Sequence, residues 1–168
     1  MITKNREVLL ANKAIKECLT YLKNKIPQKK KIINKEIKIN FDKELNNVII
    51  NILKQSGLPI ISEENNIKKN ELLLKKNKDF WIIDPLDGSL NFLRGINFAS
   101  ICISLIKNRK IFLSLIHDIH KNDTYLAINK KIYLNSKIKS FRRKFLDKNT
   151  SILSTGFPSN YNFKSKII

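Results

Sequence analysis

The chain carries four carboxylates that follow short apolar segments with the composition of buried strands: Glu63, Glu64, Asp84 and Asp87. Carboxylates buried side by side repel each other and raise each other's pKa, and a divalent cation between them is the usual remedy. Mg²⁺ takes oxygen ligands, commonly a few carboxylates with one or two backbone carbonyls. The pattern therefore predicts a Mg²⁺ site where two strands end.

The segment 84–89, with the sequence DPLDGS, supplies several metal ligands at close spacing. Pro85 fixes its own φ and favours a turn, which is expected to point Asp84 and Asp87 into one cavity. The backbone carbonyl of Leu86 is expected to point inward with them. An ordinary surface turn is the alternative interpretation of this segment taken alone.

Gly88 and Ser89 end the same segment. Glycine allows the backbone to approach an anion closely, and consecutive amides in a turn are suited to hold a phosphate. In the alternative interpretation, Ser89 is the N-cap of a short helix.

Two amphipathic helices are predicted ahead of these carboxylates. Apolar residues recur at helical spacing over 3–26, and a second apolar face extends over 42–55 after a short apolar/polar alternation at 36–41. Asp42 is expected to be the N-cap or a first-turn acid of the second helix, and Gly57 to close it.

Short strands are predicted for the rest of the chain. Strands at 58–62 and 80–83 lead into the carboxylates, with a polar surface loop or short helix at 65–78 between them. A period of two at 100–105 and further strands at 111–116, 124–128 and 132–134, with a turn at 108–109, predict an antiparallel meander. The fold class expected is therefore α/β, a layered α+β sandwich with helices packed on a mainly antiparallel sheet.

The net charge of +19 is compatible with binding to nucleic acid or anionic membranes. The basic residues are, however, spread from Lys4 to Lys166 and accompany many Ile and Asn residues, a composition that A/T-rich codons supply. The densest basic runs, 29–31 and 142–144, have few aromatic residues between them for stacking on bases. A nucleic-acid partner is therefore not expected.

Other residues bear on the compartment and on alternative metal sites. No apolar run reaches the roughly 18 residues that a membrane span needs, and no signal peptide is visible at the N-terminus. Cys18 and Cys102 form no CxxC motif and are expected to be reduced thiols of a cytoplasmic protein. His117 and His120 lie three residues apart without a nearby cysteine, so structural or exposed histidines are expected there.

The segment from Trp81 to Phe92, WIIDPLDGSLNF, resembles the first signature of the inositol monophosphatase family, W-[IV]-[IV]-D-P-[IL]-D-G-T-x-N-F. Only Ser89 departs from it, and it keeps the hydroxyl of the usual Thr. Upstream, PIISEE at 59–64 looks like the family's strand that ends in a Glu-Glu pair, and Asp42 matches the last residue of its V-T-x-x-D segment, where Ile39 replaces Thr. The segment 154–158, STGFP, also falls where the family has it.

The resemblance implies a sugar-phosphatase-like fold, hydrolysis of phosphate monoesters, and catalytic Mg²⁺ ions held by the carboxylates of Glu63, Asp84 and Asp87 and the carbonyl of Leu86. Glu63 and the Ser89 hydroxyl would orient the attacking water, and Asp42 would polarise that hydroxyl. The amides of Gly88 and Ser89 would grip the phosphate. Homodimers are common in the family.

The family's later W-D-x-A-A-G signature, which supplies a further metal ligand, is not found after Pro158. The resemblance therefore implies a metal-binding lobe over 1–150 and, over 151–168, the start of a truncated second α/β lobe. A strand at 151–154 and a turn at 156–158 are expected there. We expect weak or no activity for this chain alone, whether it is a remnant, a fragment, or one part of a site that a second chain completes.

Three functions remain open from the sequence. The first is hydrolysis of a small phosphorylated alcohol of the inositol monophosphate kind. The second is a 3′(2′),5′-bisphosphate nucleotidase, which the Ser-Glu-Glu at 62–64 favours and Asn91-Phe92 disfavours. The third is a non-catalytic remnant or partner subunit.

Overall fold

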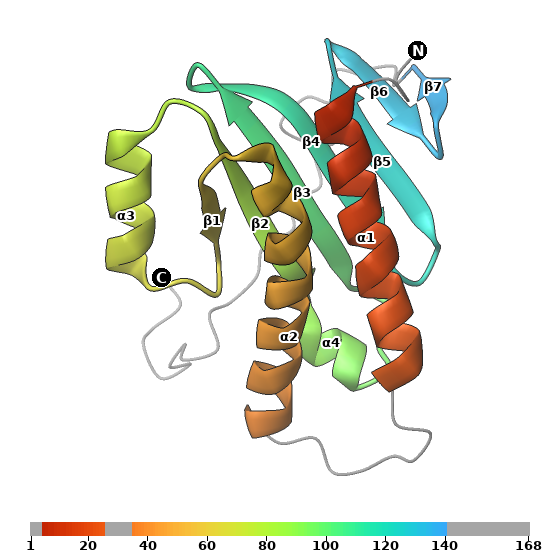
Figure 1. Cartoon of the computed structure of the whole chain (residues 1–168). Helices are drawn as coiled ribbons and strands as arrows, with labels where there is room; N and C mark the ends of the chain where they lie inside the picture. The colour runs from red at the N-terminus through yellow and green to blue at the C-terminus, as the bar shows by residue number, and fades with distance from the viewer. Residues whose placement is uncertain (1–4, 26–34, 141–168) are drawn as a thin grey trace, which may run out of the picture.

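The computed structural model describes residues 5–25 and 35–140, without the side chains of residues 35–40 (Figure 1). Its elements follow in this order along the chain: α1 (Arg6–Lys25), α2 (Lys35–Leu53), the short 3₁₀ helix η2 (Lys54–Ser56), β1 (Ile60–Ser62), α3 (Ile67–Lys76), β2 (Phe80–Asp87), α4 (Ser89–Leu93), β3 (Ser100–Lys107), β4 (Lys110–Asp118), β5 (Asp123–Ile128), β6 (Lys131–Leu134) and β7 (Lys137–Lys139).

The first two helices bury one face each. In α1 the apolar positions recur at three- and four-residue spacing, and Val8, Ala11, Ile15 and Cys18 are buried. This confirms the helix expected over 3–26.

The second helix begins seven residues earlier than expected, at Lys35. Asp42 is therefore inside α2 and is not its N-cap, so that prediction is wrong. The alternation at 36–41 is too short to identify a strand, and Phe41, Leu45 and Ile49 follow each other at four-residue spacing on one helical face. Gly57, with φ of 75°, closes η2 after α2, as expected.

The strands form one seven-stranded sheet in the order β1 to β7. The first pair, β1 and β2, is parallel, and every later pair is antiparallel, which confirms the expected meander. Three of its hairpins turn on two residues with positive φ, and each begins with Asn: Asn108-Arg109, Asn129-Lys130 and Asn135-Ser136. Asparagine tolerates that region well, which favours tight two-residue hairpins. The strand β7 is not predicted from the sequence, and α4 corresponds to the short helix of the alternative interpretation of Ser89.

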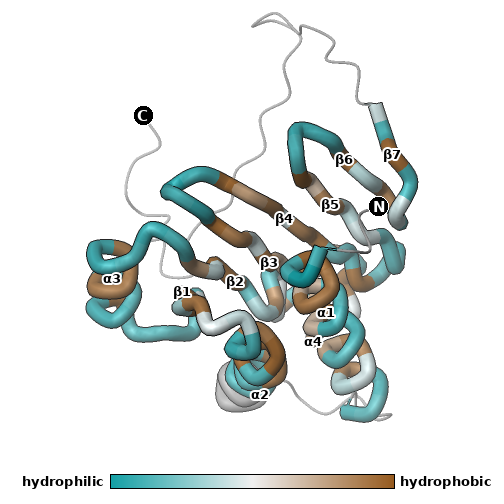
Figure 2. The backbone as a smooth tube through the Cα atoms, turned by 45° about the horizontal axis from the view of Figure 1, so that its top comes forward, coloured by the Kyte–Doolittle hydropathy of each residue, from teal (hydrophilic) through white to brown (hydrophobic). Residues whose placement is uncertain are grey.

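The molecule has a helical layer on one face of the sheet, where α1 and α2 run side by side (Figure 1). In Figure 2 the central strands β3 and β4 carry long hydrophobic stretches. Residues of these strands that face the helices are fully buried, among them Ile101, Ile103, Leu113 and Leu115. Trp81 is also fully buried, and its Nε1–H donates to the Ser56 hydroxyl at 3.0 Å. The layered architecture predicted from the sequence is therefore confirmed.

Some expectations concern residues outside the described ranges. These are the strand at 151–154, the turn at 156–158, the boundary between two lobes at 150/151 and the basic runs at 29–31 and 142–144. Across residues 5–25 and 35–140, no helix has the length and hydropathy to cross a membrane. Both Cys18 and Cys102 are free thiols.

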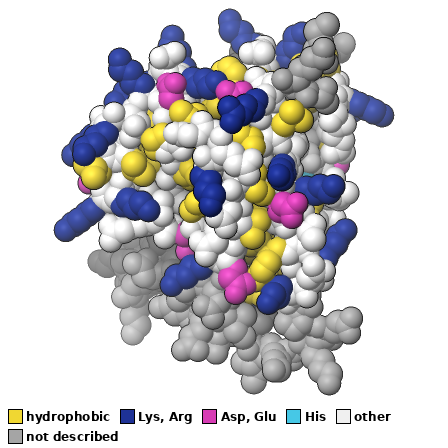
Figure 3. Space-filling model, in the orientation of Figure 1, with side chains coloured by type: hydrophobic (Ala, Val, Ile, Leu, Met, Phe, Trp, Pro, Cys, Tyr) yellow, Lys and Arg dark blue, Asp and Glu magenta, His cyan; other side chains and the backbone are white. Residues whose placement is uncertain are grey.

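Basic side chains do not gather on the face that α1 and α2 cover. Figure 3 shows Lys and Arg scattered over that face, with hydrophobic and acidic side chains between them. This distribution agrees with the even spread of basic residues along the sequence and gives no focused basic surface on this side.

Candidate metal centre

Glu63 follows the last residue of β1 and lies beside Asp84 of the neighbouring strand β2. The parallel register pairs Ser62 of β1 with Ile83 of β2, and each carboxylate is the next residue along its chain. The backbone N–H of Glu63 donates to the carbonyl of Ile83 at 3.2 Å, which extends the pairing by one step. Strand pairing therefore brings these two carboxylates together.

A β-bulge in β2 brings Asp87 to the same face as Asp84. Asp84 is paired with Cys102 and Asp87 with Ser100, so three steps along β2 correspond to two steps along β3. In a regular strand, side chains three residues apart point to opposite faces, and one extra residue restores the same face. The sequence reading expected a turn at Pro85, but β2 continues through Asp87 and the bulge has the effect assigned to the turn.

The charges of these carboxylates act on each other. Burial, a hydrogen bond with Glu63 and the negative charges of Glu63 and Asp87 together raise the pKa of Asp84 to about 7, and burial is the largest of these causes. The N–H of Leu86 donates to Asp84 Oδ1 at 3.2 Å and acts in the opposite direction. Asp84 therefore interacts with both of the other carboxylates, Glu63 and Asp87.

Cys102 lies within reach of the same negative charges. Burial is the first cause that raises the pKa of its thiol, and the charges of Asp84, Asp87 and Glu63 raise it too. Cys102 lies directly across from Asp84 in the sheet, so Asp84 shares the face of Cys102, which is the one opposite α1 and α2.

The donor set suits a magnesium ion in its chemistry. Carboxylates are hard oxygen donors, and a bound cation would offset the repulsion from Glu63 and Asp87 that helps to raise the pKa of Asp84. Within the described ranges, no three acidic, His or Cys side chains lie close enough together to surround one ion. The carboxylates instead form two pairs that share Asp84, one with Glu63 and one with Asp87.

Gly88 and Ser89 follow the bulge directly. Gly88 has φ of 76° and is the N-cap residue of α4, which has no side-chain cap, so the alternative of Ser89 as N-cap is wrong. A Cβ on Gly88 would lie 2.6 Å from the carbonyl oxygen of Phe98. The close approach of the Phe98 backbone therefore requires glycine at position 88, in addition to any requirement that a bound anion would impose. Ser89 is buried in the first turn of α4.

The structure brings the element that holds Asp42 to the one that holds Ser89. Asp42 is buried in α2, and α2 packs against α4. Leu86 is buried between the two aspartates of β2, with its amide directed to Asp84. The roles of Asp42, of the Ser89 hydroxyl and of the Leu86 carbonyl remain predictions.

A cavity of about 270 Å³ opens beside the carboxylates. Asp87 and Gly88 line it together with Ser100, Asp118 and Tyr125. Its size is near the lower limit for small-ligand pockets. The sequence reading did not single out these last three residues. The period of two in β3 contained a signal for Ser100, because it places Ser100 on the same face as Cys102.

Two other features lie apart from the carboxylates. A larger cavity of about 530 Å³ between α1 and β5–β7 has no acidic residue in its lining, so it does not extend the metal centre. His117 is buried with Nδ1 2.9 Å from the Thr124 hydroxyl, and burial lowers its pKa. His120 is exposed, with its ring 6.2 Å from that of Phe92.

Comparison with known proteins shows the family of the chain. Residues 4–167 match the model of the inositol monophosphatase family. A fructose-1,6-bisphosphatase/inositol-1-monophosphatase of Methanocaldococcus jannaschii is 34% identical over 107 residues, which cover 60% of this chain and 40% of that protein. A 3′(2′),5′-bisphosphate nucleotidase CysQ of Haemophilus influenzae is 40% identical over 74 residues, 43% of this chain and 26% of that protein.

The fold has a solved counterpart in inositol monophosphatase-II from Staphylococcus aureus MSSA476. The two superpose with a TM-score of 0.64 at 21% identity, over 77% of this chain and 49% of that one. The chain thus spans about two fifths of the M. jannaschii relative and half of the S. aureus structure.

Proposed function

Because the chain belongs to the inositol monophosphatase family, we propose that Glu63, Asp84 and Asp87 bind Mg²⁺ for the hydrolysis of a phosphate monoester of a small alcohol. One observation carries the proposal. The parallel pairing of β1 with β2 brings Glu63 beside Asp84, and the bulge in β2 brings Asp87 to the face of Asp84, where Asp87 lines a cavity. Surface carboxylates rarely converge in this way without a cation.

The proposed roles are those that the family resemblance implies for these residues. Glu63 and the Ser89 hydroxyl orient a water toward the phosphorus, with Asp42 accepting from that hydroxyl. The amides of Gly88 and Ser89 hold the phosphate oxygens at the end of β2, where the backbone turns into α4. Bound Mg²⁺ supplies neutralisation of the phosphoryl charge and a lowered pKa for its bound water. The Leu86 carbonyl completes the proposed ligand set.

A second candidate substrate is a 3′(2′),5′-bisphosphate nucleotide. The H. influenzae nucleotidase supports it, together with the Ser-Glu-Glu at 62–64. Both candidates place a phosphate monoester at the same carboxylates and differ in the alcohol that leaves.

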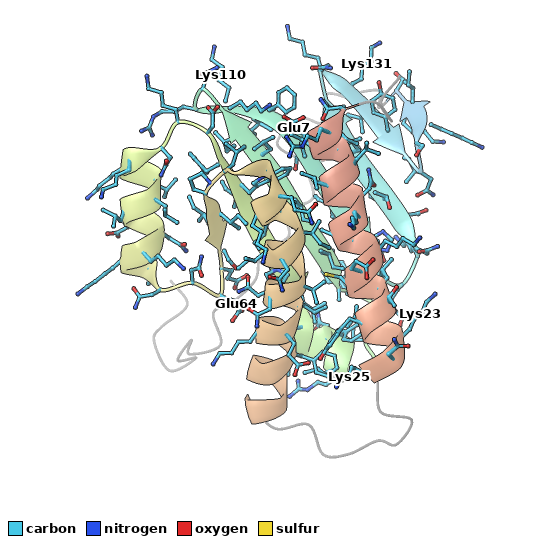
Figure 4. All side chains as sticks on the ribbon, in the orientation of Figure 1. Glu7, Lys23, Lys25, Glu64, Lys110 and Lys131 are labelled. Carbon is cyan, nitrogen blue, oxygen red and sulfur yellow. The ribbon has the colours of Figure 1, made fainter. Side chains whose placement is uncertain are left out.

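Phosphate release by the purified chain tests the proposal. Inositol 1-phosphate and adenosine 3′,5′-bisphosphate are each offered with Mg²⁺ and with EDTA. We expect release from one of them that depends on Mg²⁺ and is lost in Asp84→Asn. Glu64→Gln is the control. Glu64 is the neighbour of Glu63 in the sequence, its side chain is exposed, and it lies beside α2 at the end of β1 (Figure 4).

Two results would change the proposal. Equal release with EDTA would contradict a role for the metal. A folded sample that binds Mg²⁺ and releases no phosphate from either substrate would favour a non-catalytic partner subunit, or a site that a second chain completes.

A further inference from the structure

A buried polar cluster joins three elements directly behind Glu63. Ser62 of β1 is fully buried, and Asn46 of α2 is nearly so. The Ser62 hydroxyl donates to Asn46 Oδ1 at 2.7 Å, and Asn70 of α3 donates through Nδ2 to the carbonyl of Ser62 at 2.8 Å. A serine is thus held from two helices at once.

The same serine closes the turn that carries Glu63. The N–H of Asn65 donates to the Ser62 carbonyl at 3.1 Å, so Glu63 and Glu64 are the two central residues of a β-turn. The N–H of Glu64 donates to the Ser62 hydroxyl at 3.2 Å. The hydroxyl and the backbone carbonyl of Ser62 therefore both hold the backbone of this turn.

Glu63 needs support of this kind because its own side chain is exposed. Packing does not hold an exposed carboxylate, so the direction of its Cα–Cβ bond decides whether it reaches Asp84. Groups that orient a metal-binding side chain from behind commonly change metal affinity 10–100-fold when they are removed.

We propose that Ser62, held by Asn46 and Asn70, is a positioning residue that keeps the Glu63 carboxylate against Asp84. The inference rests on the proposed function for its consequence in Mg²⁺ binding. Its structural content, that Ser62 fixes the turn at Glu63 and Glu64, stands on the hydrogen bonds alone.

The test uses three variants of the whole chain. Ser62→Ala removes the hydroxyl, and Asn46→Ala removes its acceptor while it leaves Ser62 in place. Ser104→Ala is the control, because it also deletes a serine hydrogen bond, the half-buried one of 2.9 Å to Ser114, in the middle of the sheet and away from the turn. Thermal unfolding in EDTA verifies that each variant folds.

Two readouts are taken from each variant: the Mg²⁺ dissociation constant by calorimetry and hydrogen exchange at the amides of Glu63 and Glu64. We expect Ser62→Ala and Asn46→Ala to raise the dissociation constant about tenfold and to speed exchange at Glu64 about tenfold or more. Ser104→Ala should change neither.

The possible failures are distinguishable. Unchanged exchange and unchanged Mg²⁺ affinity in Ser62→Ala would overturn the positioning role. If exchange speeds up and the affinity stays the same, Ser62 holds the turn without serving the metal, and the proposal is also overturned. A wild-type chain that binds no Mg²⁺ would overturn the proposed function itself, and exchange would then still decide whether Ser62 fixes the turn.

Discussion

Glu63 and Asp84 occupy equivalent positions in two parallel strands, each one residue beyond the paired Ser62 and Ile83. This neighbouring position explains why the pKa of Asp84 is raised to about 7, with burial as the main cause and Glu63 as the next. A cation bound beside Asp84 would offset the repulsion from Glu63. The predictions below follow from this relationship and from the packing around it.

The stability of the metal-free chain should fall as the pH rises through about 7. Because the folded state raises the pKa of Asp84, its contribution to stability is fully present below the pKa of the unfolded state. That contribution is lost as the carboxyl ionises in the fold. Thermal unfolding between pH 5 and 8.5 in EDTA should show this loss, and Mg²⁺ should reverse it above pH 7. A melting temperature that rises over this range in EDTA would contradict the assignment.

Asp84→Asn should stabilise the metal-free protein at pH 8. The substitution removes a charge that Glu63 and Asp87 repel. The site is only half-buried, so solvent screening limits the gain to on the order of 1 kcal/mol, or about 2–4 °C in Tm. Glu64→Gln, measured in parallel, should leave Tm nearly unchanged. Loss of stability in Asp84→Asn would mean that the carboxylate has a structural partner instead.

Gly88→Ala should cost clearly more stability than Gly95→Ala. Both glycines have φ near 75°, so both substitutions carry the cost of a left-handed backbone, about 1–2 kcal/mol. A Cβ at Gly95 meets open space, whereas at Gly88 it would lie 2.6 Å from the Phe98 carbonyl oxygen. We expect Gly88→Ala to lose about 1–3 kcal/mol more in urea unfolding. Equal losses of stability would show that the backbone at Phe98 moves away from the new Cβ without a cost in folding free energy.

Lys107 should contribute more to stability than Lys121, although both form ion pairs. Lys107 pairs with Glu7 of α1 and lies over the Phe112 ring, 4.4 Å from its centre. Lys121 reaches Asp118 at 3.9 Å with its side chain 71% exposed. We expect Lys107→Gln to cost about 0.5–1 kcal/mol and Lys121→Gln to cost nothing measurable in urea unfolding.

This difference should also depend on pH. Lys107 lowers the pKa of Glu7, chiefly through their hydrogen bond. The contribution is therefore present above the pKa of Glu7 in the unfolded state and is lost as the pH falls through the lower, folded value. The two lysine variants should converge in stability in strong acid. A gap that persists there would assign the effect of Lys107 to its contact with Phe112.

Regular elements of the fold could be predicted from local pattern. The alternation in β3 and the helical spacing in α1 each occupy enough residues to select one period. The six residues at 36–41 do not, because alternation over so short a segment also satisfies the four-residue spacing that leads into Leu45. The start of α2 was therefore wrong, and with it the N-cap role of Asp42.

The geometry of the carboxylates depends on contacts that local pattern does not contain. The aspartates of the DPLD segment were recognised by type and spacing, but Asp87 reaches the face of Asp84 through a shift in pairing with Ser100 of β3. The cluster of Ser62, Asn46 and Asn70 depends equally on how α2 and α3 pack around β1. Neither arrangement leaves a periodic signal in the sequence.

Titration of the purified chain with Mg²⁺ in a calorimeter, on wild type, Asp84→Asn and Glu64→Gln, tests the central claim most directly. The account predicts that wild type and Glu64→Gln bind Mg²⁺ with similar affinity and that Asp84→Asn shows no saturable binding. Binding by Asp84→Asn with the affinity of wild type, or no binding by wild type, would contradict it.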